Sequence, residues 1–179
     1  MADDKLSRVR DAVGAHEGFP KPGIVFRDIF PVLRNPSVFN DLNDLIYEAA
    51  KAVPGVECIV GLDSRGFLFG PILALKLNVP FVPVRKKGKL PGAVERVSYT
   101  LEYGSDEFEV QKDSVSKGQK VLIIDDLLAT GGTMKAACQL MEKLEADVVL
   151  CLVIIELTDL GGRKKLTAPF KTLLEYEGE

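Results

Sequence analysis

Two acids followed by a turn of small residues form the segment with the clearest capacity for chemistry. Asp125 and Asp126 end a run of apolar residues, and a Thr-Gly-Gly-Thr turn then opens a predicted helix. Glycines let backbone N–H groups approach a ligand closely, and the start of a helix adds partial positive charge. Together with two threonine hydroxyls, these groups form a pocket suited to a phosphate monoester. The pocket comprises Ala129, Thr130, Gly131, Gly132 and Thr133.

The two acids require a different partner from the turn, because carboxylates and phosphate repel each other. Asp125 and Asp126 can accept hydrogen bonds from sugar hydroxyls or lie near a metal ion. Phosphate at the turn and a polyol at the acids together describe a ribose 5-phosphate. Nucleotide hydrolases also bind magnesium at such acids, but they need an upstream G-x-x-x-x-G-K-[ST] run, which this sequence lacks. A Gly-Gly turn can also serve only to start a helix.

A second loop with anion-binding residues is Asp63-Ser64-Arg65-Gly66, which lies between a short apolar strand and a predicted helix. Arg65 offers a forked set of donors that suits a diphosphate. Backbone N–H groups at the start of the helix, next to Ser64, add further donors. The alternative interpretation is a helix cap with an exposed arginine.

A third segment, residues 85–92, is basic and rich in glycine and proline, and it contains Arg85, Lys86, Lys87 and Lys89. In most proteins such a segment is a solvated loop. Beside a diphosphate site it becomes a mobile lid or a contribution across a dimer interface. We favour Arg85 and Lys89 as the residues that act there.

Residues 97–103 and 108–111 alternate between apolar and polar side chains, with Gly104-Ser105 between them, which predicts a β-hairpin. Because successive side chains of a strand point to opposite faces, Glu102 points away from Leu101 and Tyr103. From this pattern alone, Glu102 is an acid exposed to solvent.

Strands and helices alternate along the chain, which predicts a parallel sheet with helices on both faces. Ligands bind at the C-terminal ends of strands in such sheets. The loops 63–66, 85–92 and 125–133 all fall at such ends, so we expect them to form one site. The expected strands are 58–62, 80–84, 120–125, 148–155 and 170–176, and the expected helices are 4–13, 67–77, 133–144 and one that starts at Asn35-Pro36.

Composition indicates one domain, with at most a small appendage. The 179 residues are 46% hydrophobic, enough for a substantial core, and the net charge of −3 does not favour nucleic acid as a partner. Cys58, Cys138 and Cys151 lie in apolar segments and are expected to be reduced thiols of a cytoplasmic protein. The single histidine, His16, excludes a metal site built on a histidine pair and is expected in a loop. No signal-peptide pattern opens the chain, and the longest apolar run, 148–155, is too short to cross a membrane.

Together these motifs resemble the type I phosphoribosyltransferases, and within them the members that act on adenine. The similarity extends over nearly the whole chain and rests on residues 23–30, 61–67, 85–91, 99–103 and the block that begins at Asp125. It implies an α/β fold in one domain, 1–179, with a parallel sheet and flanking helices. The same resemblance implies a small N-terminal hood at about 1–34 and a mobile loop with a flexible β-hairpin at about 85–111.

The activity that the resemblance implies is transfer of ribose 5-phosphate from phosphoribosyl diphosphate to adenine, which gives AMP and diphosphate. The cofactor would be Mg²⁺, held mainly by the substrate near Asp125 and Asp126. A homodimer is expected on the same ground.

The resemblance also assigns roles to single residues. Family members that use hypoxanthine or guanine carry an acid directly before the Thr-Gly pair, where it handles the proton at purine N7. Here that position is Ala129, and Glu102 is the matching acid of the adenine branch. Adenine is expected to contact Val25, Phe26, Arg27 and Leu127, diphosphate is expected to contact Ser64, Arg65, Arg85 and Lys89, and the expected catalytic residues are Glu102 and Arg65.

Two other functions remain open from the sequence. A non-catalytic regulator could bind a phosphoribosyl group, although the acidic net charge and the lack of a helix-turn-helix extension speak against a nucleic-acid surface. A phosphoribosyltransferase for another base is the second alternative, against which Ala129 and Glu102 argue.

Overall fold

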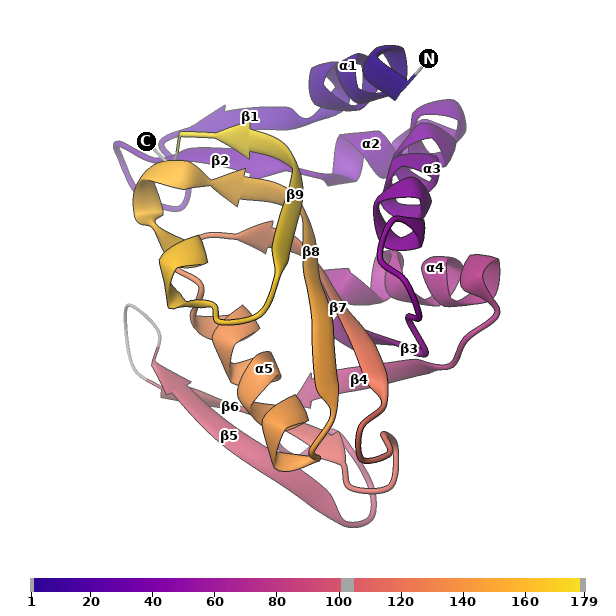
Figure 1. The fold of residues 1–179 in the computed structure, drawn as a ribbon. Coiled ribbons are helices and arrows are strands. Elements are labelled where there is room, and N and C mark those ends of the chain that lie inside the picture. The colour runs from indigo at the N-terminus through magenta and orange to yellow at the C-terminus, as the bar shows by residue number, and fades with distance from the viewer. Residues whose placement is uncertain (1, 101–104, 178–179) are drawn as a thin grey trace.

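The computed structural model describes residues 2–100 and 105–177 (Figure 1). Its main sheet is built from β3 (Cys58–Leu62), β4 (Phe81–Lys86), β5 (Val94–Thr100), β6 (Ser105–Gln111), β7 (Lys120–Leu128), β8 (Asp147–Leu157) and β9 (Phe170–Tyr176). Within the described ranges these seven strands have the order β5-β6-β4-β3-β7-β8-β9. Strands β3, β4, β7, β8 and β9 are parallel, whereas β5 and β6 form an antiparallel hairpin beside β4. The predicted fold class is confirmed.

Helices cover both faces of the sheet. The helices are α1 (Ala2–Ala12), α2 (Phe30–Arg34), α3 (Pro36–Lys51), α4 (Gly70–Leu77) and α5 (Gly132–Lys143), with short 3₁₀ helices η1 (Arg65–Leu68), η2 (Thr158–Leu160) and η3 (Gly162–Lys165). Helix α5 lies on one side of β7 and β8, and α3 and α4 lie on the other (Figure 1). A hood of α1, β1 (Gly14–Glu17) and β2 (Val25–Asp28) lies near the C-terminal ends of β8 and β9 (Figure 1).

Burial on two faces explains the apolar runs in the central strands. Val121 and Ile123 of β7 pack in the layer that contains α5, whereas Leu122 and Ile124 pack in the layer that contains α3 and α4. All four side chains are fully buried. A parallel strand covered on both faces needs continuous rather than alternating hydrophobicity, which is the pattern of this segment.

The start of α3 has the predicted cap. Asn35 accepts hydrogen bonds at Oδ1 from the backbone N–H groups of Ser37 (3.1 Å) and Val38 (3.4 Å), and Pro36 takes the first helical position. Asn35 thus satisfies two backbone N–H groups that the helix itself leaves without a partner, and Pro36 has no N–H group that would need one.

The predicted single helix at 67–77 is wrong, because the chain forms η1 and then α4. Pro71 has no N–H with which to continue a helical hydrogen-bond ladder, so it suits only the first turn of a new helix. The ring of Phe81 occupies the space above two glycines here. A Cβ atom would lie 2.4 Å from that ring at Gly70 and 2.6 Å from it at Gly61.

Two further predictions of loop structure are wrong. His16 lies on β1, opposite Phe26 of β2; the strand is short and mostly exposed, so it carries no hydrophobic pattern. The basic segment expected from Arg85 onward begins as strand, because β4 continues through Lys86 and pairs with β6 there. The hairpin partner β5 is described only to Thr100, so the predicted positions of residues 101–103 lie outside the described residues.

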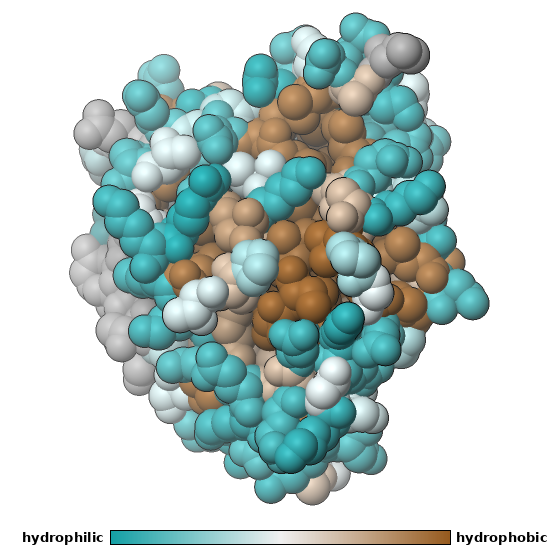
Figure 2. Space-filling model, in the orientation of Figure 1, coloured by the Kyte–Doolittle hydropathy of each residue, from teal (hydrophilic) through white to brown (hydrophobic). Residues whose placement is uncertain are grey.

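The surface carries a large apolar area. Figure 2 shows hydrophobic residues gathered in the middle of the face seen in Figure 1, with polar residues around them. Among described residues, Phe19, Phe30, Leu75 and Leu160 expose large apolar side chains. Within the same ranges, no helix combines the length and the hydrophobicity that a membrane crossing requires.

The cysteines agree with the sequence. All three lie in the described part of the chain, where they are buried and unbridged, which confirms the prediction of core thiols. The Sγ atoms of Cys138 and Cys151 are 3.5 Å apart between α5 and β8.

Candidate active site

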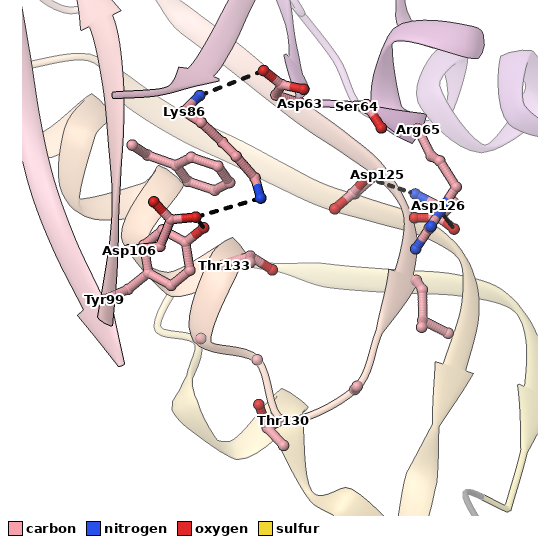
Figure 3. A pocket seen from close by; sticks show the side chains of 15 residues that line it. Asp63, Ser64, Arg65, Lys86, Tyr99, Asp106, Asp125, Asp126, Thr130 and Thr133 are labelled. Carbon is pink, nitrogen blue, oxygen red and sulfur yellow. Dashed lines mark hydrogen bonds and ion pairs between the residues drawn. The ribbon is translucent and has the colours of Figure 1, made fainter. Parts of the chain in front are cut away.

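A cavity of about 820 Å³ opens at the C-terminal ends of β3 and β7 (Figure 3). Three segments line it: the loop after β3, the C-terminal part of β7 with its two acids and the turn that follows, and the inner face of the β5–β6 hairpin with the end of β4. The lining contains Asp63, Ser64, Arg65, Lys86, Tyr99, Asp106, Phe108, Asp125, Asp126, Leu127 and the five residues from Ala129 to Thr133. Two of the three loops expected to converge therefore do so directly, and the third contributes only Lys86.

The small-residue turn is shaped by one glycine. Gly131 has a φ of +80°, a conformation that side chains disfavour, and it forms the N-cap of α5. The first N–H groups of α5 have no partner within the helix, and Thr130 and Thr133 line the cavity beside them. The first turn of α5 contains Lys135 and no acid. These donors and this charge suit an anion.

The paired acids lie at the floor of the cavity. Asp126 is 6% exposed and accepts a hydrogen bond at Oδ2 from Nε of Arg65 (Figure 3). Asp125 accepts one at Oδ1 from the backbone N–H of Asp126 (3.0 Å). Burial first, and then the charge of Asp126, raises the pKa of Asp125 well above its ordinary value, while Arg65 opposes this shift. The pair therefore combines one acid with a bound cation and one acid that holds its proton more readily.

The loop after β3 is pressed against the acids. A Cβ atom at Gly66 would lie 2.6 Å from the carbonyl oxygen of Ile124 and 3.4 Å from Oδ1 of Asp125. The peptide bond between Asp63 and Ser64 is cis. The backbone N–H of Asp63 donates to the carbonyl of Val84 (2.9 Å), which ties this loop to β4. Close contact of two backbones thus brings Ser64 and Arg65 to the edge of the acid pair.

The opposite wall contains Tyr99 and Asp106, which the sequence did not predict as site residues, and Lys86, which it favoured less than Arg85 and Lys89. Nζ of Lys86 lies 3.4 Å from Oδ2 of Asp106, and the Tyr99 hydroxyl donates to the same oxygen (3.4 Å). Burial first, and then the charge of Asp106, raises the pKa of Tyr99 to about 12. Strand alternation predicts this position of Lys86. Val82 and Val84 of β4 pack in the same core layer as Phe108 of the hairpin, and Lys86 is the next residue on that face of the strand.

The two basic residues favoured from the sequence do not line this cavity. Nε of Arg85 donates to Oδ2 of Asp63 (3.2 Å), and Nη1 of Arg85 donates to the carbonyl of Lys89 (3.4 Å). The backbone N–H of Lys89 donates to Oε1 of Glu109 (2.8 Å). The basic segment is therefore held by Asp63 of the loop after β3 and by Glu109 of its own hairpin, and within residues 85–92 the cavity lining includes only Lys86.

Of the residues expected around a base, Leu127 lines the cavity and three lie in the hood. Val25, Phe26 and Arg27 are on β2, outside the cavity lining. The Phe26 ring meets Phe19 edge to face with centroids 5.2 Å apart, and the Arg27 guanidinium lies 4.3 Å from the ring centroid of Tyr176 on β9. Glu102, the expected proton-handling acid, lies outside the described residues.

Comparisons with known proteins give a consistent result. The family model of the phosphoribosyl transferase domain matches residues 31–177. The chain is 51% identical over 180 residues to the adenine phosphoribosyltransferase of Homo sapiens, which covers 99% of this chain and 100% of that protein.

Solved structures agree in fold. The structure of adenine phosphoribosyltransferase from Saccharomyces cerevisiae, complexed with D-2,5-dideoxy-2,5-imino-altritol 1,6-bisphosphate and adenine, is similar with a TM-score of 0.91, 47% identity, and coverage of 96% of this chain and 99% of that one. The adenine phosphoribosyltransferase from Thermoanaerobacter pseudethanolicus is similar with a TM-score of 0.89 and 44% identity, covering 96% of this chain and 99% of that one.

Proposed function

The chain belongs to the phosphoribosyltransferase family, in its adenine branch, and from this premise we propose how its residues divide the work of the reaction. That reaction transfers ribose 5-phosphate from phosphoribosyl diphosphate to adenine and yields AMP and diphosphate, a step of purine salvage. One observation carries the assignment of roles: in a single cavity, the start of α5 lies beside Asp125 and Asp126 and across from Arg65. The 5-phosphate needs the free N–H groups at the start of α5, the ribose hydroxyls need the two carboxylates, and the diphosphate needs the cation of Arg65.

The turn before α5 binds the 5-phosphate. Thr130, Gly131, Gly132 and Thr133 offer hydroxyl and N–H donors where the helix leaves them free. The phosphate is remote from the reacting carbon, so its binding energy positions the ribose without taking part in the bond change.

Asp125 and Asp126 bind the ribose hydroxyls. As diphosphate leaves, positive charge develops on the ribose ring, and nearby carboxylates stabilise that charge. Hydrogen bonds donated by the hydroxyls favour the ionised form of Asp125, which counteracts the effect of burial on its pKa.

The leaving diphosphate binds at Ser64 and Arg65, with Lys86 on the opposite wall. Arg65 first has to exchange its contact with Asp126 for the diphosphate, and both partners are charged. Arg85 and Lys89 retain the role expected from the resemblance, which requires the basic segment to leave its contacts with Asp63 and Glu109.

Mg²⁺ is the proposed cofactor, and the donors present fit an ion that arrives with the substrate. The described residues contain no cluster of three or more metal-binding side chains. Mg²⁺ keeps several waters and is bound through one or two carboxylates plus substrate phosphates, which Asp125 and Asp126 can supply. When bound, it neutralises negative charge on the diphosphate.

Adenine is bound between the hood and the cavity. Backbone groups of Val25 and Arg27 read the edge of the base, and Phe26 and Leu127 pack on its two faces. Such a slot suits a 6-aminopurine, because a 6-oxopurine inverts a hydrogen bond and leaves buried groups unpaired. Glu102 handles the proton at N7, since Ala129 has no group that could.

We also propose a cytoplasmic homodimer of single-domain subunits. The reduced cysteines support the compartment. The apolar area of Figure 2 supports association, because monomers seldom leave such an area exposed.

The test of the base is a comparison of three labelled purines. Adenine, hypoxanthine and guanine are incubated separately with the protein, phosphoribosyl diphosphate and Mg²⁺, and labelled nucleotide is counted. Adenine alone is expected to yield nucleotide. A regulator without catalytic function would give no product with any base, and a transferase for another base would give product with one of the 6-oxopurines.

A further inference from the structure

The turn that opens α5 is supported from behind by the backbone of Gly162. A Cβ atom at Gly162 would lie 2.3 Å from the carbonyl oxygen of Ala129 and 2.9 Å from the backbone nitrogen of Gly131. A Cβ atom at Gly131 would lie 2.5 Å from the carbonyl oxygen of Gly162. No side chain fits on either side, so two segments of main chain are in direct contact. The shape of the turn therefore depends on where Gly162 is held.

The next residue, Arg163, fixes that position. Its Nε lies 3.2 Å from Oε1 of Glu156 and its Nη2 lies 2.5 Å from Oε2, a two-pronged pair. Nη2 also lies 3.4 Å from Oε1 of Glu175, and the guanidinium lies 4.9 Å from the ring centroid of Phe170. A planar fork held at two carboxylates and a ring has little freedom to rotate.

The carboxylate that receives Arg163 belongs to the same frame as the turn. Glu156 is 4% exposed and is paired across the sheet with Leu128 of β7, the last residue before Ala129. On its other side, Glu156 is paired with Glu175 of β9. Arg163 thus ties Gly162 to the strand position from which the turn departs. The turn and the Gly162 backbone that supports it are thus both anchored at the Leu128–Glu156 pair of the sheet.

Stability alone gives a weak reason for such a pair. Removing a carboxylate from water costs free energy that its ion pair only partly returns, and apolar residues of similar volume often serve as well. What the Arg163–Glu156 pair adds is a fixed position for the backbone of Gly162.

We propose that Arg163 is a positioning residue for the 5-phosphate: through Glu156 it holds the Gly162 backbone against the turn and so sets the place of the donors of residues 130–133. This inference rests on the proposed binding of the 5-phosphate at that turn. Arg163 does not line the cavity itself.

The test compares ligands that differ in the phosphate. Arg163→Met keeps the aliphatic stem over Phe170 and removes every donor. Glu156→Gln combined with Arg163→Met also removes the buried charge that the single change leaves unpaired. The control is Lys164→Met, which removes one exposed cation from the same short helix η3. Affinities for AMP, ribose 5-phosphate and adenosine are measured by calorimetry on folded protein, with thermal unfolding recorded alongside.

Both Arg163→Met proteins are expected to bind AMP and ribose 5-phosphate more weakly by about 10- to 100-fold, because displaced donors weaken their hydrogen bonds to the charged phosphate, and one such bond is worth a factor of that size. Adenosine affinity and the Lys164→Met control are expected to stay within about twofold of the wild type, as for substitutions away from the site. Arg163→Lys, which restores a cation without the fork, is expected to recover part of the loss.

Two results would overturn the proposal. One is wild-type affinity for AMP and ribose 5-phosphate in both Arg163→Met proteins, the single and the double variant. The other is an equal loss for AMP and adenosine, which is the mark of a merely structural role. A failure of the underlying assignment has a different signature: Gly132→Val, which obstructs the turn itself, would then leave AMP binding intact.

Discussion

The guanidinium of Arg65 is bonded to the carboxylate of Asp126, although the two residues are expected to serve different parts of one substrate. Arg65 is suited to the diphosphate and Asp126 to the ribose. Their contact pairs the cation proposed for the diphosphate with an acid proposed for the ribose, so substrate binding exchanges one ion pair for two new interactions. Leaving the buried carboxylate of Asp126 without its cation costs free energy, unless the ribose hydroxyls donate hydrogen bonds to it as Arg65 leaves.

Arg65→Ala is expected to weaken binding of phosphoribosyl diphosphate by about 1.5 to 3 kcal/mol, the usual worth of a hydrogen bond to a charged group. AMP lacks the diphosphate, so its affinity is expected to fall less. Calorimetry with both ligands makes the comparison, and Arg34→Ala, an exposed arginine on α2, is the control. Equal losses for the two ligands would place Arg65 outside the diphosphate site.

Gly131→Ala is expected to abolish AMP binding, because the methyl group meets the Gly162 carbonyl and because φ is positive. The control is Gly118→Ala, where φ is +75° and no atom lies within 4 Å. Both changes are expected to cost about 1 to 2 kcal/mol of stability from the left-handed conformation. Only the Gly131 variant is expected to lose AMP affinity. A similar loss in both would assign the effect to backbone strain and not to the turn.

Gly132→Val is expected to block AMP and phosphoribosyl diphosphate alike, because the added side chain obstructs the first N–H groups of α5. Adenosine, which has no phosphate, is expected to lose little affinity. Binding is measured by calorimetry after circular dichroism has shown a normal fold. Wild-type affinity for AMP in a folded variant would mean that the phosphate binds elsewhere.

Glu102→Gln is expected to lower kcat by about 10² to 10⁴, the range for a general acid or base. The substitution keeps the size of the side chain and removes its titratable proton. Affinity for phosphoribosyl diphosphate is expected to change little, because other residues hold that ligand. Single-turnover formation of AMP, with binding measured separately, is the decisive experiment. Near wild-type chemistry would mean that the N7 proton passes directly to water.

Asp125→Asn is expected to stabilise the protein near neutral pH while it lowers activity. The folded protein holds a proton on Asp125 at pH values where the unfolded chain has released it, because the folded pKa is raised. The free energy of unfolding therefore falls as pH rises from the unfolded-state pKa to the folded-state pKa of Asp125. Above the folded-state pKa this loss of stability is complete.

The stability gained by the Asn variant should accordingly grow with pH through that window, with a slope of at most about 1.4 kcal/mol per pH unit for one group. Thermal unfolding of both proteins from pH 4 upward measures the difference. Parallel curves would show that Asp125 titrates normally in the folded state.

The predictable part of the molecule is the part governed by local pattern. The apolar run before Asp125 and the glycine turn after Leu128 are close in sequence, so the strand end and the helix start could be placed to within three residues. The strand β7 runs on to Leu128 and so contains both acids. Asn35 could be assigned as a cap for the same reason. Each of these features depends on residues within one turn or one strand.

The missed features depend on partners distant in sequence. Strand β1 exists because β2 supplies its hydrogen bonds, and nothing in the residues around His16 announces that. Lys86 turns into the cavity because β6 extends β4 beyond its apolar stretch. The support of the turn by Gly162 joins two loops that follow different strands. Such contacts become visible only when the sheet is assembled.

The ring of Phe81, which covers Gly61 and Gly70, limits how this chain can diverge. A side chain at either glycine requires a smaller residue at position 81, and a smaller residue there alone opens a void, which is destabilising. Every single step is thus unfavourable, while a joint step can be tolerated because contacting residues are coupled. A scan of single substitutions would therefore find positions 61, 70 and 81 all intolerant. Only libraries that vary these positions in pairs would show that they can change together.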